Sequence, residues 1–302
     1  MTTCQKKTWS LRKPWHSKPR LIGNHCPMST PPLLPHPVPR VQVPQHWQRV
    51  DFISDLHLDA HEPATFDAWV QHMSHTPADA LFILGDLFEV WVGDDNPDPF
   101  ALQCVAVLKA TAQRMPVYFM CGNRDFLVGS DLLSATGMQG LSDPTLLDLS
   151  SPDDAASNRI LLSHGDALCL DDHDYLAFRA QVRQPEWQAS FLAKPLTERQ
   201  AYARDVRSKS EALKRSHTDY ADVDTQAAVA WLNATDAQVL LHGHTHKPAM
   251  HDLGHGLSRW VLSDWHADAK PPRLEVLSWL RQNAQSPTKG LCRLPLSFRF
   301  SA

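Results

Sequence analysis

The sequence predicts an α/β protein whose polar motifs stand at the carboxyl ends of strands. Short apolar runs alternate with segments of helical periodicity, a pattern typical of βαβ units. Five runs are each followed by a short motif: Asp55-Leu56-His57, Gly85-Asp86, Gly122-Asn123-Arg124-Asp125, His164-Gly165-Asp166 and Gly243-His244-Thr245-His246. Because side chains at the carboxyl ends of strands converge on one crevice in such sheets, the same pattern predicts a functional site.

The expected elements follow one another with short connections. Strands are predicted at 50–53, 80–84, 117–120, 146–149, 159–162, 238–241, 260–263 and 274–279, and helices at 64–75, 100–114 and 225–233. Residues 172–218 differ in composition, since they combine many Arg and Lys residues with large apolar side chains, and we expect them to be helical. The tail from about residue 281 has no clear order, and no internal repeat is present.

Composition and charge restrict the class of protein. The chain has 302 residues, 43% of them hydrophobic, and no apolar run long enough to span a membrane. Its six cysteines have no regular spacing, and three of them, Cys104, Cys121 and Cys169, lie in apolar segments and are expected to be reduced and buried. The net charge is −4, but residues 51–302 alone carry −12. An acidic body binds polyanions poorly, which argues against a nucleic-acid partner, and no protein partner is evident.

Residues 1–48 are expected to be a disordered, proline-rich, basic extension. They contain nine prolines and lack helical or strand periodicity. Three interpretations remain open: a basic tail, a targeting sequence, or a misassigned start, for which Met28 offers an alternative. The basic residues are not followed by the 7–15-residue apolar core of a secretory signal.

The five motifs together supply ligands for two divalent metal ions. Imidazole nitrogen and carboxylate oxygen suit Mn²⁺ and Zn²⁺. Asp86 has enough lone pairs to bridge two ions, and Asn123 adds a neutral oxygen. The full candidate set is Asp55, His57, Asp86, Asn123, His164, His244 and His246. Two such ions activate a water molecule and clamp a phosphoryl group.

Each motif taken alone has a simpler explanation. A single Asp-x-His motif is weak evidence for a metal site. A histidine in an apolar stretch is more often a packed core residue, and His-Gly-His-Thr-His alone could be a surface loop. The five motifs in this order, each at the end of a strand, are much harder to obtain by chance.

The motifs D-x-H, G-D, G-N-x-D, H-G-D and G-H-T-H resemble those of the calcineurin-like metallophosphoesterases. Three longer segments, 83–95, 121–127 and 163–172, resemble the UDP-2,3-diacylglucosamine pyrophosphohydrolases of the lipid A pathway. The similarity covers roughly residues 50–280. It implies an α+β sandwich of two central sheets flanked by helices, with a metallophosphoesterase domain at 49–280, a helical lid at about 172–218, and an unassigned tail at 281–302.

The resemblance also implies roles for particular residues. Asp55, His57, Asp86 and His246 would hold a first Mn²⁺, and Asp86, Asn123, His164 and His244 a second. Catalytic roles would fall on Asn123, Arg124 and His244. Substrate contacts would come from Asn123, Arg124, Asp172, Ser210 and His244, with Tyr175 as a plausible addition. Two further substrate positions depart from the family: Lys214 replaces its usual Asn, and His217 replaces its usual Lys.

Arg124 bears on the type of bond that is cleaved. Many metallophosphoesterases carry His at this position, which serves as a general acid for an alkoxide leaving group. Arginine stays protonated and cannot donate a proton, but it can clamp phosphate oxygens. Arginine in place of histidine therefore suits a reaction whose leaving group is a phosphate, which needs no proton. The bond cleaved in such a reaction is a phosphoanhydride. The alternative is a structural salt bridge from Arg124 to Asp125 or another neighbour.

The expected function is Mn²⁺-dependent hydrolysis of the lipid-linked UDP-sugar UDP-2,3-diacylglucosamine. The resemblance implies attack at the α-phosphorus, release of UMP and lipid X, and peripheral contact with the cytoplasmic face of the inner membrane. The helical region would bind the acyl chains, although its pattern also fits a hairpin that only packs on the sheet. Two alternatives are a soluble dimetal enzyme acting on nucleotides and a non-enzymatic scaffold; the complete ligand set disfavours the scaffold.

Overall fold

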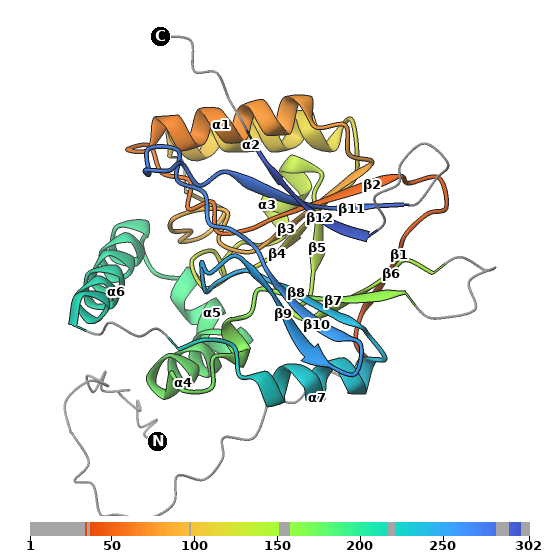
Figure 1. Cartoon of the computed structure of the whole chain (residues 1–302). Helices are drawn as coiled ribbons and strands as arrows, with labels where there is room; N and C mark the ends of the chain where they lie inside the picture. The colour runs from red at the N-terminus through yellow and green to blue at the C-terminus, as the bar shows by residue number, and fades with distance from the viewer. Residues whose placement is uncertain are drawn as a thin grey trace, which may run out of the picture. The chain divides into compact units, whose positions relative to one another are not determined.

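The computed structural model describes residues 34, 37–96, 98–150, 158–216, 221–281 and 290–296, with side chains up to residue 208 in the long helix that ends at Ser216. These described residues belong to one compact unit. Its described residues build two six-stranded sheets with helices on their outer faces (Figure 1). The predicted sandwich of two helix-flanked sheets is confirmed.

The first sheet has six strands, which include the first three strands predicted from the sequence. Its order is β12 (Gly290–Pro295), β11 (Glu275–Leu280), β2 (Arg49–Ile53), β3 (Ala80–Leu84), β4 (Val117–Met120) and β5 (Gln139–Leu141). Strands β2 to β5 are parallel, whereas β11 and β12 run antiparallel to their neighbours. All five residues of β3 are buried, as expected for a central strand covered on both faces.

The other sheet is built from the middle of the chain. Its order is β1 (Arg40–Gln42), β6 (Thr145–Asp148), β7 (Arg159–Ser163), β8 (Val239–His242), β10 (Leu257–Val261) and β9 (Ala249–Gly254). The predicted hairpin is β6 and β7, which pair antiparallel. Strands β7, β8 and β10 are parallel, so the motifs after β7 and β8 lie at the same edge.

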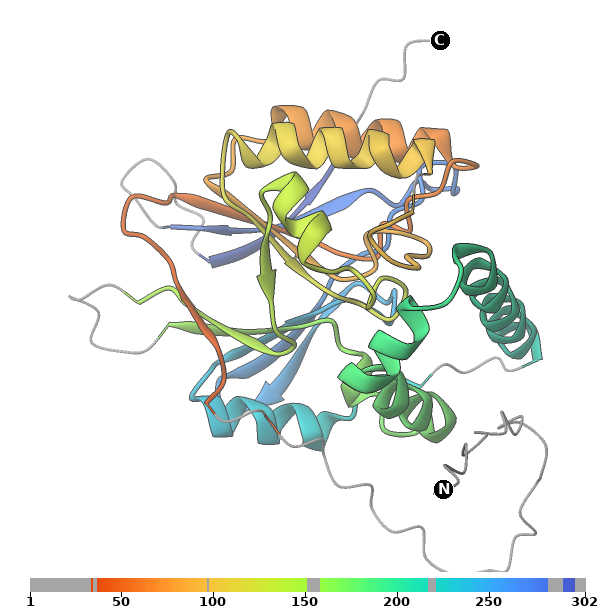
Figure 2. The same cartoon turned by 180° about the vertical axis from the view of Figure 1, so that it is seen from behind.

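The helices and the core form layers around these sheets. Helices α1 (Pro63–His75), α2 (Pro99–Ala112) and α3 (Ser130–Thr136) cover the first sheet, and α7 (Thr225–Thr235) covers the second (Figure 2). A hydrophobic cluster that includes Phe52, Phe82, Leu162 and Leu241 lies between the sheets. Two further clusters lie between the sheets and these helices, one including Trp69 of α1 and the other Trp231 of α7. This packing fixes the strand ends that carry the motifs.

Of residues 172–218, the part that the structure describes, up to Ser216, is largely helical, as predicted. They form α4 (His173–Val182), α5 (Pro185–Leu192) and α6 (Leu196–Ser216), which lie together at one side of the sandwich (Figure 1). Phe191 is buried and joins the core cluster of the first sheet, and Trp187 packs against it with ring centroids 4.8 Å apart. The base of this helical region is therefore attached to the body by apolar packing.

The expectation of disorder over residues 1–48 is wrong for residues 37–48. Strand β1 pairs in parallel with β6, and Val43 and Trp47 are buried at 1% and 5% exposure. Pro39 and Pro44 flank the strand and therefore remove no hydrogen-bond donor from within it. The carbonyl of Pro39 instead accepts from the Leu146 amide at 2.8 Å.

The expectation of no order after residue 281 is also wrong for part of the tail. Strand β12 extends the first sheet by pairing along the whole of β11. Arg293 reaches from β12 to the second sheet, where its Nη2 donates to the carbonyls of Ala249 and Val261, both at 2.8 Å. Among the described residues, no helix is long and apolar enough to cross a membrane.

Candidate metal centre

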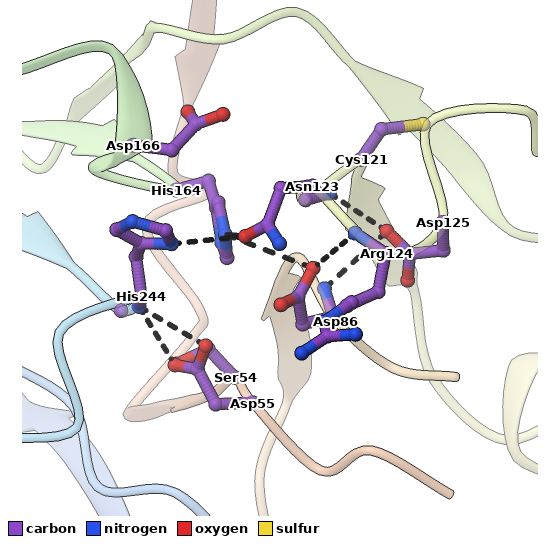
Figure 3. Close-up of polar contacts among 12 residues, drawn as sticks. Ser54, Asp55, Asp86, Cys121, Asn123, Arg124, Asp125, His164, Asp166 and His244 are labelled. Atoms are coloured by element: carbon purple, nitrogen blue, oxygen red, sulfur yellow. Dashed lines mark hydrogen bonds and ion pairs between the residues drawn. The ribbon is translucent and has the colours of Figure 1, made fainter. Parts of the chain in front are cut away.

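The five motifs meet at one place between the two sheets. Each follows the carboxyl end of a strand: Asp55 comes after β2, Asp86 after β3, Asn123 after β4, His164 after β7 and His244 after β8. Figure 3 shows these side chains pointing toward one another from separate loops. The convergence predicted from the strand-end pattern is therefore present.

The backbone at the site adopts a conformation that most residues avoid. Positive φ angles between 48° and 66° occur at five of the seven candidate ligands: Asp55, His57, Asp86, His244 and His246. This left-handed region is uncommon for residues other than glycine and carries a conformational cost, so the surrounding contacts must impose it. The strained turns redirect the side chains from the strand axes into the site.

Glycines allow the loops to approach closely. A Cβ atom on Gly122 would overlap the Asp86 carboxylate, and one on Gly243 would overlap Asp55 and Ser54. Gly85 has a φ of +91°, and a Cβ there would lie 2.5 Å from the His164 ring. The glycine that precedes Asp86, Asn123 and His244 in each motif is thus required by space.

The first group of donors contains Asp55, His57 and His246. One ligand atom from each lies within 4.8 Å of the others. The Nε2 atoms of His57 and His246 are 3.3 Å apart, and His246 Nε2 is 3.4 Å from Asp55 Oδ1. Asp86 Oδ2 lies 3.9 Å from His57 Nε2. Three predicted ligands of the first ion are therefore together, with Asp86 beside them.

The second group is arranged around Asn123. Its Oδ1 lies 3.0 Å from His164 Nε2 and 2.9 Å from His244 Nδ1. Asp86 Oδ1 lies 3.7 Å from His164 Nε2. Asp55, Asp86 and His164 also offer ligand atoms within 4.8 Å of one another. Asp86 thus contacts histidines of both groups, and Asp55 also takes part in both.

The donor set fits divalent cations. His164 Nδ1 faces the Leu84 carbonyl at 2.9 Å, so this nitrogen carries a hydrogen, and in the neutral ring Nε2, which faces the oxygen of Asn123, is left to bind a metal. Burial lowers the pKa of His164, but Asp86, Asp166 and Asp55 outweigh this effect and raise the pKa to about 9. Without a cation the ring therefore carries a proton among these carboxylates, and a bound cation would take the place of that proton.

Asp125 supports two of the loops, a role that the sequence analysis missed. Its buried carboxylate accepts hydrogen bonds from the amides of Gly122 at 2.7 Å and Leu87 at 2.8 Å. Burial and the neighbouring Asp86 carboxylate raise the pKa of Asp125 to about 6. The signal that could have found it was its place as the last residue of the Gly122–Asp125 motif.

Glu89 is a second residue that the sequence analysis missed. Its Oε2 lies 3.1 Å from Nδ1 of His57, and its Oε1 lies 3.5 Å from Nη1 of Arg124. Burial raises the pKa of Glu89, but contact with His57 and the charge of Arg124 outweigh it and lower the pKa to about 2. Arg124 therefore pairs with Glu89, whereas the Asp125 carboxylate binds backbone amides.

Helix α4 brings Tyr175 to the site and is capped by Asp172, and both of these predicted substrate contacts have protein partners. The Tyr175 hydroxyl donates to the buried carboxylate of Asp166, and its ring stacks on His244 with centroids 5.9 Å apart. Asp172 is exposed, and its carboxylate caps α4 by accepting from the Tyr175 amide at 3.1 Å. Ser210 and Lys214 lie in α6, where side chains are outside the described part, and His217 lies outside the described residues.

Comparisons with known proteins agree with this geometry. Residues 48–248 match the model of the calcineurin-like phosphoesterases. The UDP-2,3-diacylglucosamine hydrolase of Chromobacterium violaceum is 46% identical over 72% of this chain and 90% of its own length. The proteins of that name from Xanthomonas axonopodis pv. citri and Bordetella pertussis are 43% and 44% identical, covering 74% and 73% of this chain and 94% and 87% of their own. The chain is therefore a hydrolase that belongs to the calcineurin-like phosphoesterases and, within them, to the UDP-2,3-diacylglucosamine hydrolase family.

Proposed function

We propose that this chain hydrolyses the diphosphate of UDP-2,3-diacylglucosamine, with water attacking the α-phosphorus and UMP and lipid X as products. The observation that carries the proposal is the convergence of seven nitrogen and oxygen donors from five strand ends. The substrate is taken from the name of relatives at 43–46% identity. The donors supply the hydrolytic chemistry, and the relatives suggest which diphosphate is bound.

We infer that two Mn²⁺ ions are the cofactors. Asp55, His57, Asp86 and His246 would hold one, and Asp86, Asn123, His164 and His244 the other. Bound ions of this kind polarise a phosphoryl group and lower the pKa of a water molecule. The two nearby histidine groups and the carboxylate of Asp86 between them support this division.

Arg124 and His244 would act directly on the substrate. The Arg124 side chain is 17% exposed and follows Asn123, so its guanidinium can reach a phosphate bound at the site. Its permanent charge would stabilise the departing phosphate monoester, which needs no proton. His244 is held in one orientation by Asn123 at Nδ1, by the Tyr175 ring and by Asp55 at its amide.

Helices α4 to α6 would form the lid that accepts the acyl chains. Trp187, Phe191 and Tyr202 make an aromatic cluster between α5 and α6, with ring centroids 4.8 to 6.3 Å apart. Trp187 and Tyr202 remain partly exposed, so apolar area is present beside the site. An enzyme that takes a diacylated substrate would work at the cytoplasmic face of the inner membrane as a peripheral protein.

The test is hydrolysis by chelated protein to which Mn²⁺ is returned in steps. UDP-2,3-diacylglucosamine is compared with nucleotide diesters and dinucleoside polyphosphates, and UMP release is measured. We expect Mn²⁺-dependent release of UMP from the lipid substrate alone. The Asp86→Ala variant should lose at least about 100-fold in rate, because it removes a ligand and not merely a supporting residue. Turnover of the soluble nucleotides with the lipid untouched would instead establish a nucleotide phosphohydrolase.

A further inference from the structure

Three separate elements meet at the carboxylate of Glu89. His57 reaches it from the loop after β2, Arg124 from the loop after β4, and Arg207 from helix α6. Glu89 itself follows β3, and its amide donates to the carbonyl of Leu58 at 3.2 Å. Its side chain is 14% exposed, and His57 and Arg124 are also largely buried, so their charges interact strongly with Glu89, whereas Arg207 is 42% exposed and its ion pair is partly screened by solvent.

The two oxygens of Glu89 have different partners. Oε2 lies 3.1 Å from His57 Nδ1. Oε1 lies 3.2 Å from Arg207 Nε and 3.5 Å from Arg124 Nη1. One oxygen therefore faces a candidate metal ligand, and the other faces two guanidinium groups. This division allows one residue to perform two different tasks.

The contact at Oε2 determines which nitrogen of His57 can bind a metal. A carboxylate beside Nδ1 favours the tautomer with hydrogen on that atom and leaves the lone pair on Nε2. Nε2 is the atom that lies 3.3 Å from His246 and 3.9 Å from Asp86. Glu89 thus orients the His57 ring toward the candidate first ion.

The contact at Oε1 connects helix α6 to the loops of the site. Arg207 is a residue of α6, and it also lies 3.7 Å from Asp59 Oδ2. The guanidinium groups of Arg124 and Arg207 share one oxygen, so the negative charge of Glu89 offsets their mutual repulsion. Both cations are thereby kept beside the place where a diphosphate would bind.

We propose that Glu89 is a positioning residue with two separable tasks, orienting His57 for metal binding through Oε2 and attaching α6 to the site through Oε1. The second task deepens the proposed function, because α6 belongs to the lid that would cover the substrate. The first task concerns metal affinity alone and holds for any substrate.

Two substitutions at Glu89 separate the tasks. Glu89→Gln keeps an oxygen that can accept from His57 but removes the negative charge that attracts the arginines, whereas Glu89→Ala removes both. Free Mn²⁺ is measured by electron paramagnetic resonance during titration of the full-length protein. We expect Glu89→Ala to weaken Mn²⁺ binding by about 10- to 100-fold, and Glu89→Gln to restore it to within about threefold of the original chain. Equal losses in the two variants would overturn the orienting role.

The attachment of α6 is measured by hydrogen–deuterium exchange without substrate. In both Glu89 variants, the backbone amides of residues 200–208 should exchange several-fold faster than in the original chain, whereas the exchange rates of α4 should be unchanged. Asp59→Asn should also speed exchange in α6 but leave Mn²⁺ affinity intact, because the Asp59 carboxylate contacts Arg207 and His61, neither of which is a candidate ligand. Glu198→Gln, which removes an exposed carboxylate of α6 paired with Lys194, is the control expected to change neither reading. Unchanged α6 exchange in Glu89→Gln would overturn the attachment, and neither reading depends on which diphosphate is hydrolysed.

Discussion

The backbone amide of His244 donates to both carboxylate oxygens of Asp55, at 3.0 and 2.9 Å, although the residues are 189 positions apart. Asp55 is a candidate ligand of the first ion and His244 of the second. The contact joins the two sheets, since Asp55 follows β2 and His244 follows β8. The Asp55 side chain therefore holds the loop that carries His244, so it links the two groups of candidate ligands.

This contact predicts an asymmetry in metal stoichiometry. Asp55→Ala removes a ligand and also releases the His244 loop, so both ions should be lost. His57→Ala removes only a ligand of the first ion, so the second should stay bound. Bound Mn²⁺ after gel filtration, measured by atomic emission, checks the difference. Equal metal content in the two variants would contradict the link between the halves.

Removing the amino-terminal residues should show how much strand β1 contributes to the stability of the fold. Removing residues 1–48 deletes β1 together with the buried side chains of Val43 and Trp47. We expect the free energy of unfolding to fall by several kcal/mol, since losing a buried Trp side chain alone costs about 3–5 kcal/mol. Urea denaturation provides the measurement.

The matched control for that truncation removes residues 1–33, none of which the structure describes. It should keep the original urea midpoint and the original turnover. Identical midpoints for the two truncated chains would show that β1 contributes nothing to stability.

His72 should make the protein less stable in mild acid. Burial lowers its pKa from 6.5 to about 4, although Asp51, 3.8 Å away, opposes the shift. The unfolded chain takes up a proton below pH 6.5 that the folded chain accepts only near pH 4. Stability is therefore complete above pH 6.5 and falls as the pH drops toward 4, by up to about 1.4 kcal/mol per pH unit.

The variant His72→Gln tests this contribution. It should lose less stability between pH 6.5 and 4.5 than the original chain. The slope of the free energy of unfolding against pH should correspond to about one proton fewer taken up on unfolding. Urea midpoints at several pH values give the slope. An unchanged slope would mean that other buried groups account for the acid sensitivity.

Replacing two aromatic residues of α5, Phe191 and Trp187, by alanine should have different effects on stability and on substrate binding. Phe191 is 5% exposed and part of the core, so Phe191→Ala should cost about 3–5 kcal/mol of stability. Trp187 is only partly buried, and Trp187→Ala should chiefly raise KM for the diacylated substrate above that for a deacylated analogue. Thermal melts and steady-state kinetics separate the two effects. Leu102→Ala, which alters an exposed residue of α2, is the control.

The sequence predicted the strand ends well because their signals are local. Apolar runs such as Ala80–Leu84 are adjacent to the motif they position, and the strand and its loop can be read from one segment. The strand expected at 260–263 instead spans Leu257–Val261. Its beginning is set by antiparallel pairing with β9, in which Leu257 lies opposite Gly254, and not by the apolar residues that made it recognisable.

The supporting roles of Glu89 and Arg183 could not be predicted because their partners are distant in the chain. Glu89 acquires its role from Arg207 in α6, and Arg183 from the Gly122 carbonyl, which its Nη2 contacts at 2.8 Å. Strands β1 and β12 were missed for a related reason. Strand β1 has only three residues and is flanked by prolines, and β12 lies in a weakly patterned part of the sequence. Each becomes a strand by pairing with an edge that already exists.

The order of pairing in the first sheet has a consequence for synthesis of the chain. Strand β2 is among the first elements to leave the ribosome, but one of its two neighbours is β11, with Phe52 opposite Leu277. That edge of β2 therefore stays without its partner until nearly the whole chain has been translated. An unpaired apolar strand edge is prone to associate with other chains. Slow translation or premature termination before residue 275 would thus leave a nascent protein that depends on chaperones.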